Sequence, residues 1–293
     1  MLLQKASSLA VVICHGSYHT PKPFEPFLAA LKAQGIEAYC PQLPTSDLTK
    51  LNVGDPTHPD YNRDPPPGGY PQPVDDTAVI DEVLRKLIEG EGKNVLLIGH
   101  SSGGGSATAA AIPELQARTR QAKKLPGGIV GIFYECGFVI PVGESINSFF
   151  QPKDGSPPVV PPYCQLHSHG FEGLLSTKDG AKYFFNGLDE HTAKEYEATL
   201  TASPVFSTIL RNDAYIALPC AYLLTENDMA LPLPYQEQMV VLQRARAGVH
   251  ITTYQSACGH SPHLVCTNEL VARVQEFGQQ VMQGLSSNSS ASS

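Results

Sequence analysis

The chain of 293 residues is long enough for one large domain that buries about three-quarters of the surface its unfolded form exposes. Its 28 Asp and Glu residues against 20 Lys and Arg give a formal net charge of −8, and no basic run could follow a phosphate backbone. We therefore expect no nucleic-acid partner, and no membrane partner because no apolar stretch is long enough to cross a bilayer.

Short apolar runs alternate with amphipathic segments in the first half of the chain. Strands are predicted over residues 9–14, 36–40, 94–98 and 128–133. Helices are predicted over residues 23–34, 74–89 and 104–111. This alternation predicts an α/β fold with a mostly parallel sheet, right-handed crossovers and flanking helices. Residues 45–73 interrupt it as a long, proline-rich surface excursion.

The alternation of strands and helices stops between residues 141 and 204, where prolines and aromatic residues are frequent and the predicted helices are short. It then resumes with strands over 220–224 and 250–254, a helix over 233–247 and a closing helix through Val274. We therefore predict a core in two parts (1–140 and 205–285), an inserted cap (141–204) and a disordered, serine-rich tail (286–293).

The seven cysteines are an odd set without CxxC spacing, and most lie in or beside strand-like runs. This pattern predicts buried free thiols in a reducing compartment. Residues 1–5 and the apolar run 9–14 are read as the approach to a core strand, because the run is too brief for a signal peptide. A cytoplasmic protein is the expectation.

Gly99-His100-Ser101-Ser102-Gly103 lies between a predicted strand and a predicted helix. A serine at the tip of such a turn is presented in strained backbone geometry, beside the positive end of the helix that follows. Ser101 is therefore the candidate nucleophile, and the Ser102 amide points to where an oxyanion would form. The alternative is a strand-to-helix turn without chemistry.

A nucleophilic serine needs a base, and the base needs a carboxylate to orient it. Asp228 follows the strand 220–224, at the sheet edge where ligand-facing loops emerge, and is the candidate acid. It could instead only cap a turn. Glu226 is the local rival and Glu135 the distant one.

His260 follows the last predicted strand in a flexible turn and is the candidate base. His263 competes with it, but we expect its side chain, at the start of the last helix, to lie farther from the sheet edge. For either residue the alternative is a solvated loop histidine. The order Ser101, Asp228, His260 favours His260.

The loop after the first strand should supply the second oxyanion donor, the Ser17 amide, because Gly16 permits close approach of the backbone. His15 is expected to brace this loop. His167 and His169 have a spacing that metal sites use, but they lack a third ligand, so no metal and no cofactor are predicted.

These motifs together resemble the α/β-hydrolase superfamily, and within it the branch of small esterases that contains plant methyl esterases and hydroxynitrile lyases with their fungal and bacterial relatives. The resemblance implies an α/β-hydrolase fold with an inserted cap, Ser101, Asp228 and His260 as the catalytic triad, and Ser17 and Ser102 as the oxyanion hole. It also implies that His19, with Tyr18 beside it, lines the substrate pocket.

The predicted activity is that of a cofactor-independent serine hydrolase acting on a small, fairly apolar carboxylic ester or lactone. A lyase, cyclase or transferase using His260 as a general base is the first alternative, because one fold supports several chemistries. A ligand receptor that works through cap movement is the second. The partner is a small molecule, and the sequence leaves a homodimer open.

Overall fold

Six parallel strands form the central sheet, described here from a computed structural model over residues 9–290. They lie in the order β2-β1-β3-β4-β8-β9, and every neighbouring pair is parallel. Their bounds are β1 Leu9–Cys14, β2 Glu37–Tyr39, β3 Asn94–His100, β4 Gly128–Glu135, β8 Cys220–Thr225 and β9 Ile251–Ser256. The predicted α/β fold with its mostly parallel sheet is thereby confirmed.

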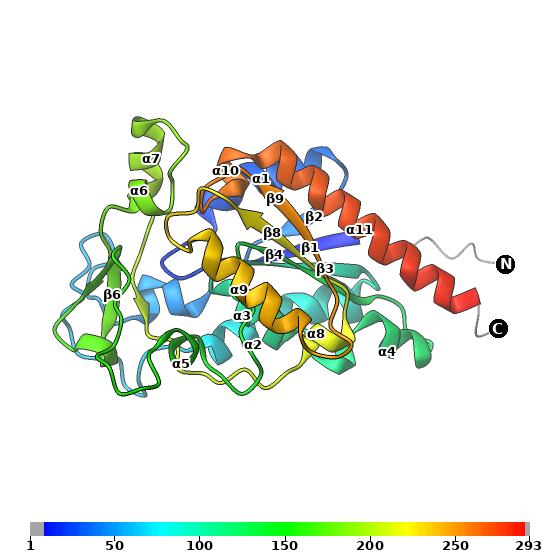
Figure 1. Cartoon of the computed structure of the whole chain (residues 1–293), viewed down its shortest axis with the longest axis horizontal. Helices are drawn as coiled ribbons and strands as arrows, with labels where there is room; N and C mark the ends of the chain where they lie inside the picture. Colours follow the sequence, from blue (N-terminus) through cyan, green and yellow to red (C-terminus); the bar gives the residue numbers. More distant parts are fainter. Residues whose placement is uncertain (1–8, 291–293) are drawn as a thin grey trace.

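Helices cover both faces of this sheet (Figure 1). One layer contains α2 (Pro73–Arg85), α3 (Gly103–Ala110), α8 (Ala214–Ala217) and α9 (Leu233–Arg244). The other contains α1 (Glu25–Ala33), α4 (Ala117–Ala122), α10 (Pro262–Val265) and α11 (Thr267–Ser290). Alternate residues of β1 serve the two layers: Val12 packs with the first and Val11 with the second. Burial on both faces explains why the core strands are continuous apolar runs.

The segment between β4 and β8 forms a separate set of elements, and we call residues 141–204 the insert. It contains α5 (Ile146–Phe150), α6 (Gly180–Tyr183), α7 (Glu190–Glu197) and a small antiparallel sheet of β5 (Cys164–Leu166), β6 (Leu174–Thr177) and β7 (Ser203–Pro204). This small sheet was not predicted, because its strands are too short to show a period. Whether the insert acts as a cap stays a prediction.

The insert and the excursion 45–73 lie together beyond the carboxyl ends of the central strands (Figure 1). Leu51 and Val53 of the excursion share a buried apolar cluster with Leu174 and Ala202 of the insert. The long excursion is therefore packed against the insert instead of projecting into solvent. Together they enclose the sheet edge at which ligand-facing loops emerge in such folds.

Two expectations about the end of the chain are wrong. Cys258 and Cys266 form a disulfide, because the loop after β9 turns back through α10 and brings their Cα atoms to 6.4 Å. The other five cysteines are free. The helix α11 continues through Ser290, with the Ser286 and Ser287 hydroxyls donating to carbonyls four residues earlier, so residues 286–290 are helical and not disordered.

Residues 1–8, which include the predicted approach to the first strand, and residues 291–293 of the predicted tail lie outside the described part of the chain. Within residues 9–290, no helix combines the length and the apolar character that crossing a bilayer requires.

Candidate active site

Ser101 lies at the tip of the turn between β3 and α3, in left-handed backbone geometry with a φ of 52°. Such a φ costs a non-glycine residue about 1–3 kcal/mol and persists only where the surroundings enforce it. The Ser101 amide donates to the Glu135 carbonyl at 3.3 Å, and its own carbonyl accepts from the Phe138 amide at 2.8 Å. A Cβ at Gly103 would lie 2.1 Å from the Cys14 carbonyl oxygen, so this turn passes β1 only with glycine there. The predicted strained turn is present.

Asp228 and His260 meet beyond the ends of β8 and β9, with 2.8 Å between Asp228 Oδ2 and His260 Nδ1. The same carboxylate accepts bonds from the amides of Ala230 and Leu231 and from the side chains of Thr225 and Gln236. Because a carboxylate accepts, Nδ1 carries a proton in this bond, and the neutral ring then has its lone pair at Nε2. His260 Nε2 is buried without a hydrogen-bond partner in the described structure. The imidazole is thus held in the tautomer that a general base requires.

Ser101 and His260 are brought into the same region, but no hydrogen bond joins Ser101 Oγ to His260 Nε2 among residues 9–290. Gly16 lies close to both Ser101 and His100, and His100 in turn lies close to His260. The His100 and His260 ring centroids are 4.9 Å apart, and a Cβ at Gly16 would lie 3.2 Å from Ser101 Oγ and 3.3 Å from His100 Nδ1. In structures without substrate such bonds are often long and tighten when the substrate binds.

The predicted oxyanion donors, Ser17 and Ser102, are also adjacent. The Ser17 amide donates to Ser102 Oγ at 2.7 Å, and the two hydroxyl oxygens are 2.8 Å apart. An oxyanion would accept from such an amide at about 2.7–3.1 Å. In this structure the Ser102 hydroxyl therefore takes the acceptor position on the Ser17 amide, which the sequence could not reveal.

His19 is fully buried, and its Nδ1 donates to the Ser17 carbonyl at 2.9 Å. Burial lowers the pKa of His19 well below its ordinary value, with neighbouring His260 and His263 acting in the same direction. Its Nε2 is therefore a neutral acceptor, buried without a partner in the described region. Tyr18 instead contacts the insert, through its hydroxyl on Cys164 Sγ at 3.3 Å and its carbonyl on the Thr201 amide at 2.7 Å.

The insert covers this group of residues through Phe184, whose ring centroid lies 5.5 Å from both His260 and His19. Ser261 Oγ donates to the Phe184 carbonyl at 2.7 Å, and Asn186 donates to the Asn227 carbonyl at 2.8 Å. The site is closed, because Ser101 is 8% exposed and His260 only 1%. Sequence reasoning missed Phe184, since an aromatic residue in an irregular segment has no distinguishing pattern.

A cavity of about 560 Å³ lies between the excursion and the insert, away from these residues. Its walls include Tyr70, Gln72, Asn147 and Phe171, and none of the predicted site residues lines it. We place the chemistry at Ser101 and His260, because the orienting carboxylate, the strained turn and the unpartnered ring nitrogen are there.

The two rivals Glu135 and His263 are paired with each other, with 2.6 Å between Glu135 Oε1 and His263 Nδ1. Both side chains are fully buried, and His263 contacts the end of β4, so the expectation that its side chain is held away from the sheet edge is wrong. The alternative of a solvated loop histidine is wrong for the same reason. The short helix α10 turns His263 back onto the end of β4. Glu226, the local rival of Asp228, is exposed.

The fold and this arrangement define the class of the protein as an α/β hydrolase. A model described as the alpha/beta hydrolase family matches residues 11–274, so the chain belongs to that family. The α/β hydrolase nvfD of Aspergillus novofumigatus is 26% identical over 273 residues, or 90% of this chain and 94% of that relative.

Solved structures show the same fold. A pyrethroid hydrolase from Sphingobium faniae JZ-2 gives a TM-score of 0.67 at 18% identity, with 93% of this chain and 98% of that chain covered. The methylesterase MES16 from Arabidopsis gives 0.60 at 16% identity, covering 92% and 99%. Polyneuridine aldehyde esterase gives 0.66 at 14% identity, covering 93% and 100%. The predicted membership of the α/β-hydrolase superfamily is confirmed, and the solved structures that share the fold include a plant methylesterase.

Proposed function

We propose that this α/β hydrolase is a serine hydrolase that cleaves a small, fairly apolar carboxylic ester or lactone. The observation that supports this most strongly is the Asp228–His260 pair, which leaves a buried, unpartnered Nε2 on a ring of fixed tautomer. In this role His260 Nε2 takes the proton of Ser101 as its Oγ attacks the ester carbonyl. Asp228 keeps the ring oriented and stabilises the imidazolium that forms.

The negative charge that develops on the carbonyl oxygen needs two donors. The Ser17 and Ser102 amides fill this role in the proposal, and the substrate oxygen replaces the Ser102 hydroxyl as the acceptor on Ser17. His260 then donates its proton to the departing alkoxide, leaving an acyl group on Ser101. Water, deprotonated by the same imidazole, releases the acid and restores Ser101.

The surroundings favour a substrate that is mostly apolar with one polar group. Phe184 contributes aromatic surface beside His260, and Tyr18 packs against Phe184. His19 Nε2 is a neutral acceptor in the same enclosure and suits a hydroxyl or enol donor. The methylesterase activity named for MES16 and the hydrolase activity named for the pyrethroid hydrolase agree with such a substrate class.

A fluorophosphonate probe tests the nucleophile directly, because it reacts with activated serines without requiring the substrate. We expect labelling of the native protein at Ser101, mapped by peptide mass, and none in Ser101→Ala. Ser106→Ala, a buried serine on α3 outside the site, is the matched control and should label like the native protein. A folded native protein that does not label would overturn the proposal.

Hydrolysis is then separated from the alternatives by turnover of short acyl esters in heavy-oxygen water. We expect one labelled oxygen in the acid released. Turnover without label would reject hydrolysis and favour the lyase, cyclase or transferase alternative. Ligand-dependent capture of a partner without turnover would favour a receptor.

A further inference from the structure

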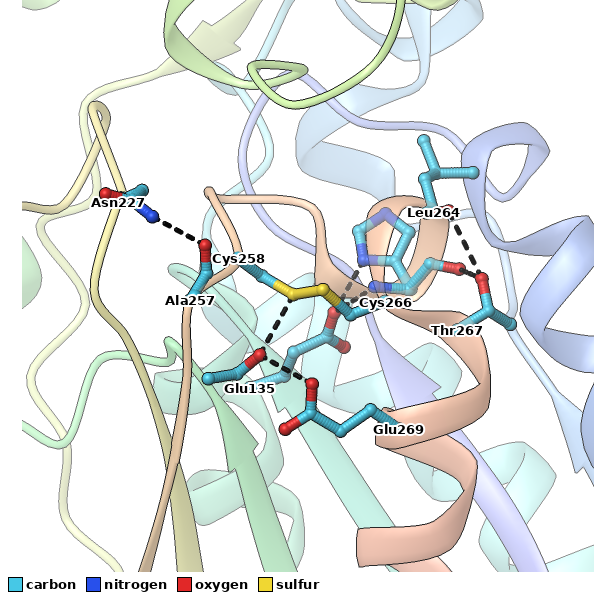
Figure 2. Close-up of a disulfide and its surroundings, with 10 residues drawn as sticks. Glu135, Asn227, Ala257, Cys258, Leu264, Cys266, Thr267 and Glu269 are labelled. Atoms are coloured by element: carbon cyan, nitrogen blue, oxygen red, sulfur yellow. Dashed lines mark hydrogen bonds and ion pairs between the residues drawn. A yellow bond between two sulfur atoms is a disulfide. The ribbon is translucent and has the colours of Figure 1, made fainter.

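A second carboxylate–imidazole pair joins Glu135 to His263, which lies on the same loop as His260. Glu135, the last residue of β4, accepts two bonds at Oε1, from His263 Nδ1 at 2.6 Å and from the His263 amide at 3.1 Å (Figure 2). Both residues are fully buried. A buried carboxylate is costly unless it is paired and hydrogen-bonded, so these contacts stabilise the position of the loop.

Glu135 also contacts the turn that carries Ser101, the proposed nucleophile. Its backbone carbonyl accepts from the Ser101 amide at 3.3 Å, so one residue holds the nucleophile turn through its main chain and the base loop through its side chain. The next strand along contributes in the same way, because His100 Nε2 donates to the His260 carbonyl at 2.9 Å. Ser101 and His260 are thereby both held in place by residues at the ends of β3 and β4.

The opposite face of His263 is also fixed. Phe24 stacks on its ring with 4.0 Å between centroids and an interplanar angle of 20°. The disulfide between Cys258 and Cys266, drawn in Figure 2, closes the loop that contains His260 and His263. The loop is thus held at its ends by a covalent bond and at its centre by Glu135.

His100, Glu135 and His263 also place three metal-capable atoms near one another. Glu135 Oε1 accepts two N–H donors and His100 Nε2 donates to a carbonyl, whereas Glu135 Oε2, His100 Nδ1 and His263 Nε2 are buried without a partner in the described structure. The bonds that are present, at Glu135 Oε1 and His100 Nε2, are the ones that support a role in positioning.

We propose that Glu135 and His263 are positioning residues that fix His260 Nε2 relative to Ser101 Oγ, independently of the orienting role of Asp228. The proposal rests on the proposed serine hydrolase function. A displacement of about 1 Å between reacting groups can slow a reaction by about 100-fold, so a modest shift of this loop would be measurable.

Two substitutions at His263 separate the hydrogen bond from the aromatic packing. His263→Asn places an amide nitrogen near the position of Nδ1 and keeps the bond to Glu135, while it loses the stacking on Phe24. His263→Phe keeps the stacking and loses the bond. We expect the rate of Ser101 labelling by the fluorophosphonate to stay within about threefold of native in His263→Asn and to fall at least about tenfold in His263→Phe.

The folded fraction of both variants is checked by thermal unfolding. Asp76→Ala, which removes a buried carboxylate on α2 away from the loop, is the control for loss of a buried polar bond. Equal labelling by His263→Phe and the native protein, or an equal loss in both variants, would overturn the proposal. If His263→Phe does not fold, Glu135→Leu, which removes the acceptor of both bonds, is expected to label at least about tenfold more slowly, and an unchanged rate contradicts the proposal.

A second readout does not depend on reactivity. The proton on His260 Nδ1, bonded to Asp228, should give a downfield proton resonance that is absent from Asp228→Asn. We expect this resonance to persist in His263→Asn and to shift or broaden in His263→Phe. A native protein that shows the resonance but does not label would refute the proposed function alone, whereas a resonance unchanged in His263→Phe would refute the positioning role.

Discussion

The Asp228–His260 and Glu135–His263 pairs are alike in composition and differ in surroundings. Each joins a carboxylate oxygen to an imidazole Nδ1, at 2.8 Å and 2.6 Å, and each leaves a buried Nε2 without a partner in the described structure. The two histidines are three positions apart on one loop. A buried carboxylate–imidazole bond is therefore not sufficient to identify a general base.

The remaining contacts separate the two pairs. Asp228 accepts four further bonds, two of them from amides of its own loop, so its orientation does not depend on His260. Glu135 is held from the end of a core strand, and its Oε2 has no partner within residues 9–290. His260 faces Phe184 of the insert, whereas His263 faces Phe24 of the core. Position relative to Ser101 and the insert, more than the bond itself, distinguishes a proposed catalytic role from a positioning role.

The largest expected effect comes from Asp228→Asn. The amide can favour the wrong tautomer of His260, and the comparable change in serine proteases costs about 10⁴-fold. We expect labelling of Ser101 to slow by roughly that factor, while thermal unfolding shows a folded protein. Asp55→Asn, in the exposed part of the excursion, should leave the labelling rate unchanged. Loss of less than tenfold would mean that the two pairs have been assigned the wrong roles.

Removing the disulfide tests whether both pairs depend on the same loop. The double change Cys258→Ser and Cys266→Ser releases a loop with a sequence separation of 8. Chain-entropy estimates for a loop this short give a loss of about 2–3 kcal/mol in the free energy of unfolding. Urea unfolding with and without a dithiol reductant measures it, and Cys40→Ser, a free cysteine, is the control. An unchanged unfolding midpoint would show that noncovalent contacts alone hold the loop.

The buried histidines outside the two carboxylate–imidazole pairs should make the free energy of unfolding depend on pH. Burial lowers the pKa of His15 to about 4 and the pKa of both His19 and His100 below the ordinary value. Between these pKa values the unfolded chain binds protons that the folded chain does not, so stability present above pH 6.5 is lost as the pH falls from 6.5 to about 4. For His15 alone the loss reaches about 3 kcal/mol at pH 4.

Asp76 acts in the opposite direction, because burial raises the pKa of its carboxyl to about 6. Protonation of the folded state below pH 6 offsets about 2 kcal/mol of the histidine penalty. We therefore expect the fall in unfolding free energy between pH 7 and pH 4 to be about 2 kcal/mol steeper in Asp76→Asn than in the native protein. Parallel curves from urea unfolding would show that Asp76 keeps its ordinary pKa.

The sequence was informative where a local pattern specifies a local structure. The apolar runs predicted the core strands, and Gly99 to Gly103 predicted the strained turn at Ser101. Asp228 and His260 were selected by chain order, and the structure places them in contact. Their pairing with Ser101 as a triad stays a prediction.

Features that depend on contacts between distant segments could not be predicted. Nothing in the neighbourhood of Glu135 or Cys266 indicates that α10 turns back on the sheet edge. The Ser102 hydroxyl reaches Ser17 only because two loops converge. Gln236 offered a weak signal that was missed, since it is a polar residue on the same side of α9 as buried Met239 and Val240 and bonds Asp228.

The contacts of Phe184 and Asn186 have a kinetic consequence. These two residues of the insert bond the loops of both His260 and Asp228, and a Cβ at Gly259 would collide with Asn186 at 2.3 Å. Because Ser101 is only 8% exposed, we expect a molecule that reaches it to require this segment to move away. We expect the observed labelling rate to rise with probe concentration and then level off at a ceiling set by the opening rate, which Asn186→Ala should raise.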